Sequence, residues 1–307
     1  MGIDVSKSVL DVHLHPQGES LRFANDRHGL RALRRRLAGL RVALVVMEPT
    51  GPWHKAVHHS LDEAGYPVAL VNPYRSRKFA DALGRLAKTD RIDARVLALY
   101  GALLEPRITP PARPGLNQLG ALVAARRATI GDRTALRNRL AANPGGLVRR
   151  QLQARLAMVD RHLKRLEAEI AAHIQKMPEL ERANRLLLSI PGVGKVAAMT
   201  LVADMPELGQ CSRQQIAALA GVAPMNWDSG TLRGRRIIKG GRAHVRNTLY
   251  MAAVAASRCN PDLRAFYQRL IQNGKKPKLA LTAVMRKLII IANTLIAENR
   301  TWEPIKP

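Results

Sequence analysis

Residues 88–94 read Lys-Thr-Asp-Arg-Ile-Asp-Ala, so two aspartates, Asp90 and Asp93, lie three positions apart. The apolar residues that follow, through Leu99, predict a helix that begins in this stretch. Residues three apart share one face of a helix, so both carboxylates are expected on the same side. Acidic residues also favour a helix N-terminus, and a plain helix start would explain the pair equally simply.

Two isolated acids in predicted strands favour a functional interpretation. Asp4 lies in a short strand near the N-terminus, and Glu48 ends the apolar run of residues 42–47. A carboxylate at the end of a buried strand costs free energy unless a partner compensates its charge. The two strand acids and the pair Asp90 and Asp93 are therefore expected to share one divalent metal site.

The order of the predicted elements indicates the fold of the first part of the chain. In chain order they are three strands within residues 2–24, a helix capped by Asn25 or Asp26, a strand ending at Glu48, a helix starting near Pro52, a strand at residues 68–71 and the helix at Asp90. A meander followed by alternating helices and strands is typical of the α/β RNase H-like fold. There a carboxylate on the first strand meets one at the end of the fourth, and further acids come from a late helix.

The charge of the chain predicts a polyanionic partner. The 307 residues are 47% hydrophobic, enough to bury a core, and carry a formal net charge of +27. Residues 1–110 carry 17 basic and 11 acidic side chains, a net +6, so the remainder carries +21. Acids gather in the first part and bases in the second, which indicates a catalytic domain joined to a part that binds nucleic acid.

Other features exclude several classes of protein. Cys211 and Cys259 are solitary, which disfavours a zinc ribbon or a disulfide framework. The apolar run of residues 288–292 is too short and too close to charges to span a membrane. The N-terminus has no signal-peptide pattern. We therefore expect a cytoplasmic, nucleoid-associated protein without a membrane partner.

Prolines between residues 106 and 114 predict a boundary after the first domain, residues 1–110. Residues 111–182 are rich in Leu, Ala and Arg with apolar residues at helical spacing, and residues 143–146 break the pattern. This predicts a long antiparallel helical arm, which is either a dimerisation coiled coil or a spacer. Residues 183–307 form the predicted third part, whose last segment, from residue 248 to 297, reads as two helices.

The sequence Pro-Gly-Val-Gly at residues 191–194 predicts a helix-hairpin-helix-like turn. Glycines permit a tight turn, and the helix that follows offers free N–H groups to a phosphate. Gly192, Gly194 and Lys195 are therefore candidate contacts to a nucleic-acid backbone, which would carry no sequence information. The alternative is an ordinary connection between two helices.

Residues 219–246 are dense in glycine and basic side chains, and Ser229 lies among them. A serine in a loop is usually a solvated turn residue, so this segment alone gives little support for a nucleophile. Basic side chains near glycines predict phosphate contacts. The candidates are Arg233, Arg235, Arg236, Lys239, Arg242 and Arg246.

Taken together, the segments around Asp4, Glu48 and Asp90, the Pro-Gly-Val-Gly turn and the Ser229 loop resemble one family over essentially the whole chain. This is the IS-one-ten family of DEDD transposases from bacterial insertion sequences. The resemblance implies a RuvC-like domain whose four acids match Asp4, Glu48, Asp90 and Asp93. It also implies a mainly helical C-terminal transposase domain with a nucleophilic serine, which matches Ser229. Relatives often carry a second serine just before the Lys-Gly-Gly segment, where this chain has Ile238.

The resemblance further implies recombinases that act as multimers on donor and target DNA, guided by a structured bridge RNA. The expectation is a dimeric or tetrameric recombinase in which Ser229 attacks a phosphodiester and the four acids hold Mg²⁺ or Mn²⁺. One alternative is a RuvC-like nuclease or junction resolvase that activates water. Another is a decayed transposase remnant that only binds DNA, which the presence of all four acids and Ser229 disfavours.

Overall fold

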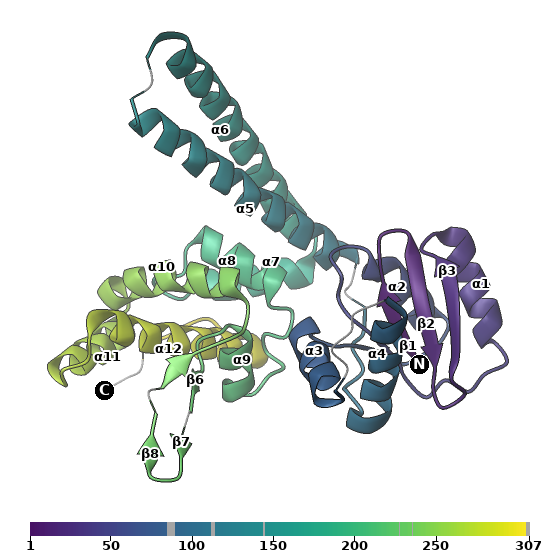
Figure 1. Ribbon diagram of the computed structural model, residues 1–307. Coiled ribbons are helices and arrows are strands. Elements are labelled where there is room, and N and C mark those ends of the chain that lie inside the picture. Colours follow the sequence, from purple (N-terminus) through teal and green to yellow (C-terminus); the bar gives the residue numbers. More distant parts are fainter. Residues whose placement is uncertain (85–89, 112–113, 144, 227, 235, 305–307) are drawn as a thin grey trace. The chain divides into compact units, whose positions relative to one another are not determined.

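The computed structural model describes residues 1–84, 90–111, 114–143, 145–226, 228–234 and 236–304. Arg235 lies outside the described residues, as do the side chains of Asp90 and Arg233. By its internal contacts the chain divides into two compact units, Met1–Ala112 and Arg113–Pro307. Figure 1 shows the elements of both units.

The first unit is built on a mixed five-stranded sheet. Its strands are β1 (Gly2–Val5), β2 (Val9–Leu14), β3 (Glu19–Ala24), β4 (Val45–Met47) and β5 (Val68–Leu70). They lie in the order β3-β2-β1-β4-β5, with β1, β2 and β3 antiparallel and with β4 parallel to both β1 and β5. This arrangement is compatible with the RNase H-like domain that the sequence predicts.

In the described part of this unit the sheet is accompanied by the helices α1 (Arg27–Leu37), α2 (His54–Glu63), α3 (Pro73–Ala82) and α4 (Asp90–Leu104). Asp26 is the N-cap of α1, because its carboxylate accepts hydrogen bonds from the backbone N–H groups of His28 and Gly29 at 2.9 and 2.8 Å. The sequence left Asn25 and Asp26 as alternatives for this cap. The predicted helix start at Asp90 is confirmed.

Alternation along the strands separates the two faces of the sheet. Ile3 and Met47 pack in a core with side chains of α1 and α2. Val46 faces the other side, where it packs with Leu97 and Tyr100 of α4. By the same alternation, Asp4 within β1 and Glu48 directly after β4 lie on the face that α4 covers.

Two sequence expectations for this unit need correction. The apolar run of residues 42–47 is a strand only from Val45, because Val42–Leu44 makes no ladder pairing. The helix α3 has no counterpart among the predicted elements, which passed from the strand at residues 68–71 to Asp90. The local signal was present: Asn72 caps α3 and Pro73 is at its first position, a common start of a helix.

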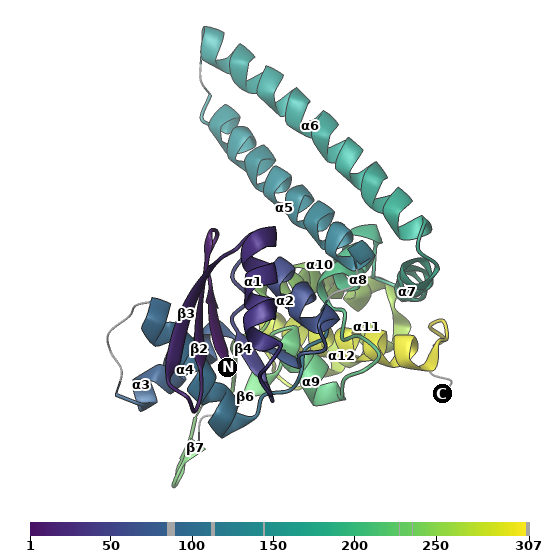
Figure 2. The ribbon, with the colours of Figure 1, turned by 90° about the vertical axis from the view of Figure 1, so that its right-hand side faces the viewer.

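The second unit begins with two long helices, α5 (Pro114–Ala141) and α6 (Gly146–Gln175), which run side by side in opposite directions (Figures 1 and 2). Leu136 of α5 and Leu152 of α6 are both buried. Ion pairs between the helices join Arg126 to Glu167 at 2.6 Å and Arg133 to Asp160 at 2.9 Å. The predicted break at residues 143–146 separates them.

The body of the second unit consists of helices around one apolar core. They are α7 (Pro178–Leu188), α8 (Lys195–Asp204), α9 (Arg213–Leu219), α10 (Ala243–Cys259), α11 (Pro261–Gln272) and α12 (Pro277–Glu298). The core includes Leu201, Leu249 and Ile289, each completely buried. The small strands β6 (Pro224–Met225), β7 (Asp228–Ser229), β8 (Leu232–Arg233) and β9 (Ile237–Ile238) lie between α9 and α10.

The C-terminal segment contains three helices, whereas the sequence predicted two. The missed break is at Asn260 and Pro261, where α10 ends and α11 begins. Proline suits the first turn of a helix but not its interior, and the completely buried Asn260 caps α11 by accepting from the N–H of Leu263. Among the described residues α12 alone is long and apolar enough for a membrane span, yet it contributes Leu288 to the core.

Candidate functional site

Asp4 and Glu48 occupy neighbouring positions at one end of the sheet. Ile3 and Met47 are partners in the parallel ladder of β1 and β4, and the two acids are the residues directly after them. Asp4 shares the face of Gly2, which lies against α4. Both acids are half-buried. The adjacency that the sequence predicted for these two residues is therefore present in the backbone.

The helix α4 carries the other two acids to the same face. A Cβ added to Gly2 would lie 2.1 Å from the carbonyl oxygen of Ala94, so the helix backbone rests directly on β1 and only glycine fits there. Farther along α4, Gly101 lies against Val46 of β4 and close to Leu44, the residue that precedes this strand. The helix thus runs against the direction of these strands. Its first turn, which contains Asp90 and half-buried Asp93, lies toward the end of the sheet that carries Asp4 and Glu48.

A serine that the sequence did not single out contacts Glu48. The hydroxyl of Ser76, on α3, is within hydrogen-bond distance of the Glu48 carboxylate and 3.0 Å from the carbonyl oxygen of Pro73. Ser76 is buried, 3% exposed. A hydroxyl has one proton, so it donates to one of the two oxygens at a time. Ser76 therefore orients Glu48 from the helix that sequence patterning missed.

The chemistry of these side chains fits a hard divalent cation, because carboxylate oxygens are the ligands that Mg²⁺ and Mn²⁺ prefer. Among the described residues, however, no three carboxylate, histidine or cysteine side chains lie close enough together to hold a metal ion. The side chain of Asp90 is not among those that the structure describes. The structure thus brings Asp4, Glu48 and Asp93 to one face, and the predicted four-acid site stays a prediction.

Asp11 is a further carboxylate on this face, opposite Asp4 in the antiparallel ladder. It is 5% exposed and accepts two hydrogen bonds from the guanidinium of Arg22, at 2.9 and 3.0 Å. A bidentate arginine compensates a buried carboxylate well. Asp11 is therefore held in an ion pair, and its alternating position in the strand was the only sequence signal for it.

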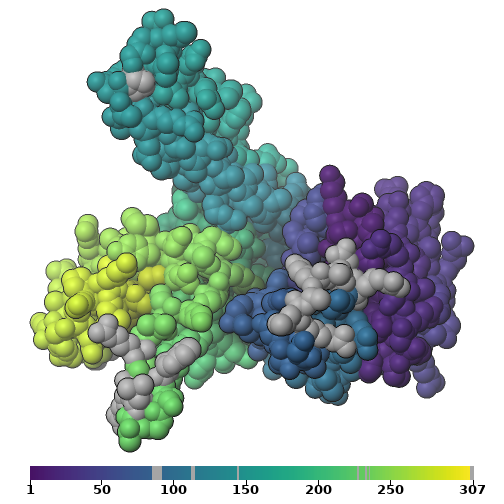
Figure 3. Space-filling view, in the orientation of Figure 1, coloured from purple at the N-terminus to yellow at the C-terminus, as the bar shows by residue number. Residues whose placement is uncertain are grey.

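Ser229 lies at the tip of a β-hairpin. It pairs with Leu232 across the turn formed by Gly230 and Thr231, and the strands β6 and β9 form the base of the same excursion. Gly230 has a positive φ of 54°, as a tight hairpin turn requires. Ser229 is exposed, and the hairpin protrudes from the surface of the second unit (Figure 3). This exposure makes the hydroxyl accessible to a large substrate.

The side chains beside Ser229 form a local ion pair. Arg236 Nη1 donates to the carboxylate of Asp228 at 2.5 Å, and this hydrogen bond lowers the pKa of Asp228 although partial desolvation opposes it. Side chains alternate along a strand, so Asp228 and Ser229 are on opposite faces of β7. Arg236 is thus committed to Asp228. The backbone of Arg233 pairs with Asp228, and Lys239 is exposed.

Two of the predicted phosphate contacts, Arg242 and Arg246, have hydrogen-bond partners within the second unit. Arg242 donates from both terminal nitrogens to Glu207, at 2.8 and 2.5 Å. Arg246 donates to the carbonyl oxygen of Gly240 at 2.8 Å. A Cβ on Gly241 would lie 2.2 Å from the backbone nitrogen of Gly221, so loop-to-loop packing by itself requires these two glycines.

The Pro-Gly-Val-Gly turn connects α7 to α8. Gly192 has φ +100° and packs against α10, where an added Cβ would lie 2.5 Å from the Cα of Ala256. Gly194 is the N-cap of α8, and a Cβ there would meet open space. Lys195 is the first residue of α8 and is exposed. Gly192 is therefore explained by packing, whereas Gly194 and Lys195 leave the helix N-terminus open to an anion.

A hollow of about 490 Å³ lies beside this turn. It is lined by Gly192 and Gly194, by Arg126 and Arg127 of α5, and by His244 of α10. His244 Nε2 is 3.1 Å from a carboxylate oxygen of Asp204, yet burial, the largest effect, lowers the pKa of His244. The open N-terminus of α8 thus faces a concave surface with basic side chains.

The family profile described as Transposase, of the DEDD type from IS110 elements, matches residues 1–143, and the profile described as Transposase IS116/IS110/IS902 family matches residues 184–268. The two matched segments contain all four candidate acids and Ser229.

Several curated proteins align with nearly the full chain. The pilin gene-inverting protein of Moraxella bovis is 29% identical over 99% of this chain and 97% of its own length. A probable family 20 transposase of Pseudomonas aeruginosa is 24% identical over 99% of this chain and 98% of its own. The transposase for insertion sequence element IS1111A of Coxiella burnetii is 24% identical over 87% of this chain and 81% of its own. The chain therefore belongs to the IS110 family of insertion-sequence transposases, enzymes that act on DNA.

Proposed function

We propose that this transposase is a recombinase that cuts and rejoins DNA through a covalent bond between Ser229 and a DNA phosphate. The observation that carries the proposal is the exposed position of Ser229 at the tip of its hairpin, within the segment that matches the transposase profile. The adjacent placement of Asp4 and Glu48 on the face covered by α4 supports a metal-assisted reaction, which the rival function below shares. The relative from Moraxella bovis is named for inverting a pilin gene, and inversion is one rearrangement that such chemistry produces.

In the proposed reaction the oxygen of Ser229 attacks the phosphorus of a phosphodiester. The bond from phosphorus to one sugar oxygen breaks, that oxygen leaves with a proton, and a base takes the serine proton. The phosphoserine link keeps the energy of the broken ester, so the reverse attack by a DNA hydroxyl rejoins a strand. Asp228 is unsuited to be the base, because it lies on the opposite face of β7 and binds Arg236.

Asp4, Glu48, Asp90 and Asp93 would hold Mg²⁺ or Mn²⁺, which would stabilise negative charge on the phosphate. Ser76 helps to orient one of these ligands, Glu48. Lys239, Lys195 and Arg235 would contact the backbone of donor and target DNA. We further propose, from the family resemblance, that a structured RNA guides the enzyme and that it works as a dimer or tetramer.

A covalent adduct is the decisive test. Radiolabelled donor DNA, incubated with the enzyme and boiled in detergent, should leave label on the protein. Ser229→Ala should abolish the adduct while DNA affinity stays within about twofold, because one hydroxyl contributes little beside many charge contacts. Thr231→Ala, an exposed hydroxyl in the same turn, is the matched control and should keep the adduct.

The rival function is a RuvC-like nuclease that activates water at the four acids, which the α4-covered face favours. Cleavage by Ser229→Ala at the wild-type rate would establish that rival and refute the serine mechanism. Mixing Glu48→Gln with Ser229→Ala protein tests assembly: recovered recombination means that acids and serine come from different copies. Sequencing RNA that co-purifies with the protein tests the guide, and light scattering gives the oligomeric state.

A further inference from the structure

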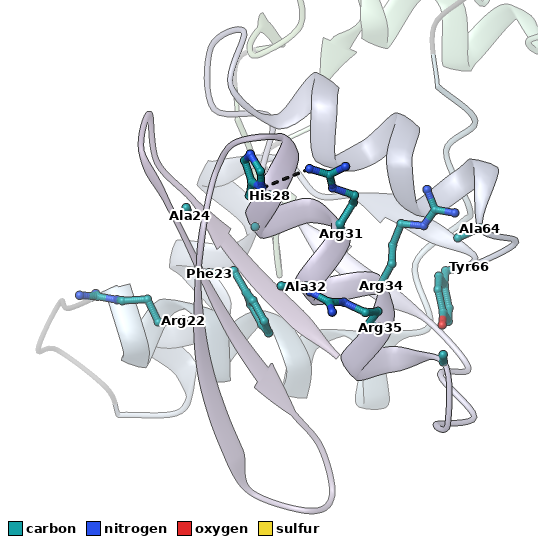
Figure 4. Close-up of a pocket in the computed structure, with 12 residues that line it drawn as sticks. Arg22, Phe23, Ala24, His28, Arg31, Ala32, Arg34, Arg35, Ala64 and Tyr66 are labelled. Atoms are coloured by element: carbon teal, nitrogen blue, oxygen red, sulfur yellow. Dashed lines mark hydrogen bonds between the residues drawn. The ribbon is translucent and has the colours of Figure 1, made fainter.

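The first unit has a concave surface away from the acid site. A groove of about 1260 Å³ is lined by the strand β3, by α1 and by the turn that follows α2 (Figure 4). The groove is lined on the α1 side by Arg31, Arg34 and Arg35. His28 lies at one end of the groove and Tyr66 at the other. The helix α1 packs on the Ile3 face of the sheet, opposite the face of Asp4.

The charged side chains that line the groove are all basic. None of the described residues that line it is acidic, and α1 contains no acidic residue along its eleven positions. Arg31, Arg34 and Arg35 are exposed, and His28 Nδ1 is 3.1 Å from Arg31 Nη2. Two nearby arginines are compensated: Arg22 points away from α1 and binds Asp11, and Arg36 binds Glu19. Positive charge is thus left where the surface is hollow.

The helix dipole explains part of this charge, because cations stabilise a helix C-terminus and α1 ends in three arginines. It does not explain Arg31, which lies in the middle of the helix. Nor does it explain the hollow between α1 and β3. A concave, basic surface whose charges have no acidic neighbour in its lining concentrates negative ligands.

We infer that this groove binds the phosphate backbone of one strand of the DNA on which the enzyme acts, at a place separate from the scissile phosphate. Arginine forks match phosphate oxygens, and several arginines along one helix contact successive phosphates of one strand. The sheet lies between the groove and Asp4, so the bound segment is not the one held at the acid site. The inference rests on the family's action on DNA and is independent of whether Ser229 is the nucleophile.

The experiment uses the full-length protein and matched single substitutions on α1. Arg34→Gln removes a groove charge, whereas Arg36→Gln removes the same charge from the same helix outside the groove lining. Fluorescence anisotropy is measured with a labelled DNA duplex and with an RNA of equal length over a range of salt concentrations. Arg34→Gln should reduce the slope of log K against log salt on duplex DNA by about 0.9, the value for one lost phosphate contact.

The triple variant Arg31→Gln/Arg34→Gln/Arg35→Gln should reduce the slope by up to about 2.7, and Arg36→Gln by clearly less than Arg34→Gln. A photo-crosslinking amino acid in place of Tyr66 should attach to DNA in the parent protein and not in the triple variant. If Arg34→Gln and Arg36→Gln reduce the salt slope equally, the change reflects net charge and not a contact in the groove. That result would overturn the inference. A loss confined to RNA would overturn the assignment to DNA. The Ser229→Ala background gives the same binding result, which separates this test from that of the catalytic proposal.

Discussion

Arg242 donates hydrogen bonds from both terminal nitrogens to the two carboxylate oxygens of Glu207, joining the N-cap of α10 to the turn after α8. Both side chains are about one-third exposed. The sequence around Arg242 predicted a phosphate contact, because arginine in a glycine-rich loop is typical of one. The pairing indicates that this arginine stabilises the second unit.

Arg242→Ala should destabilise the second unit by about 1 to 2 kcal/mol, because it leaves a half-buried carboxylate without its partner. Its DNA affinity, measured well below the unfolding transition, should change less than that of Lys239→Ala. Chemical denaturation followed by circular dichroism gives the stability, and anisotropy gives the affinity. A stability loss in Lys239→Ala as large as in Arg242→Ala would contradict this division of roles.

Glu207 should make the second unit sensitive to acid. Burial would raise the pKa of Glu207, but the hydrogen bonds and charge of Arg242 outweigh it and lower that pKa below its ordinary value of 4.5. A carboxyl group with a depressed folded pKa stabilises the fold above its unfolded pKa and loses that contribution as pH falls through the folded value. The stability difference between the parent protein and Glu207→Gln should therefore be constant above about pH 5.5 and shrink below pH 4.5. A difference that does not shrink as the pH falls below 4.5 would contradict the assignment.

Ser76 should act as a positioning residue for Glu48. Ser76→Ala removes the hydroxyl that contacts the carboxylate, and loss of such an outer partner weakens metal binding by about 10- to 100-fold. The midpoint of thermal stabilisation by Mn²⁺ should move to higher concentration by that factor, without a DNA substrate. Ser76→Thr, which keeps a hydroxyl, should restore much of the binding. Ser8→Ala, a change at an exposed serine, is the control. If it moves the Mn²⁺ midpoint as far as Ser76→Ala does, Ser76 is not a positioning residue.

The two glycines of the Pro-Gly-Val-Gly turn should respond differently to substitution. Gly192→Ala combines an unfavourable φ of +100° with a clash against Ala256 and should cost about 2 to 5 kcal/mol. Gly194→Ala meets open space and should cost less than about 1 kcal/mol. Thermal unfolding compares the two. If Gly194→Ala also leaves DNA affinity unchanged while Lys195→Ala lowers it, the lysine supplies the contact and the cap does not.

Local sequence determined much of the first unit. Period-two alternation placed the three N-terminal strands, Asp26 was one of two predicted caps, and the acid pair marked the start of α4 at Asp90. Asp4 and Glu48 were expected to be neighbours because, in the predicted RNase H-like fold, a carboxylate on the first strand meets one at the end of the fourth. These features follow from backbone periodicity, capping and burial, which act over a few residues and are therefore visible in the sequence. The missed helix α3 and the break at Asn260 also had local signals, a proline preceded by a capping asparagine.

Tertiary structure alone decided which partner each functional group has. The sequence could not distinguish Arg242, which binds Glu207 thirty-five residues away, from Lys239, which is exposed. It could not show that Gly192 packs on Ala256, that Ser76 reaches Glu48, or that three arginines of α1 line a groove beside β3. Ion pairs and close contacts depend on which distant segments the folded core brings together. Basic side chains in one glycine-rich segment therefore differ in their surroundings, because Arg242 is held in an ion pair by a distant carboxylate whereas Lys239 stays exposed.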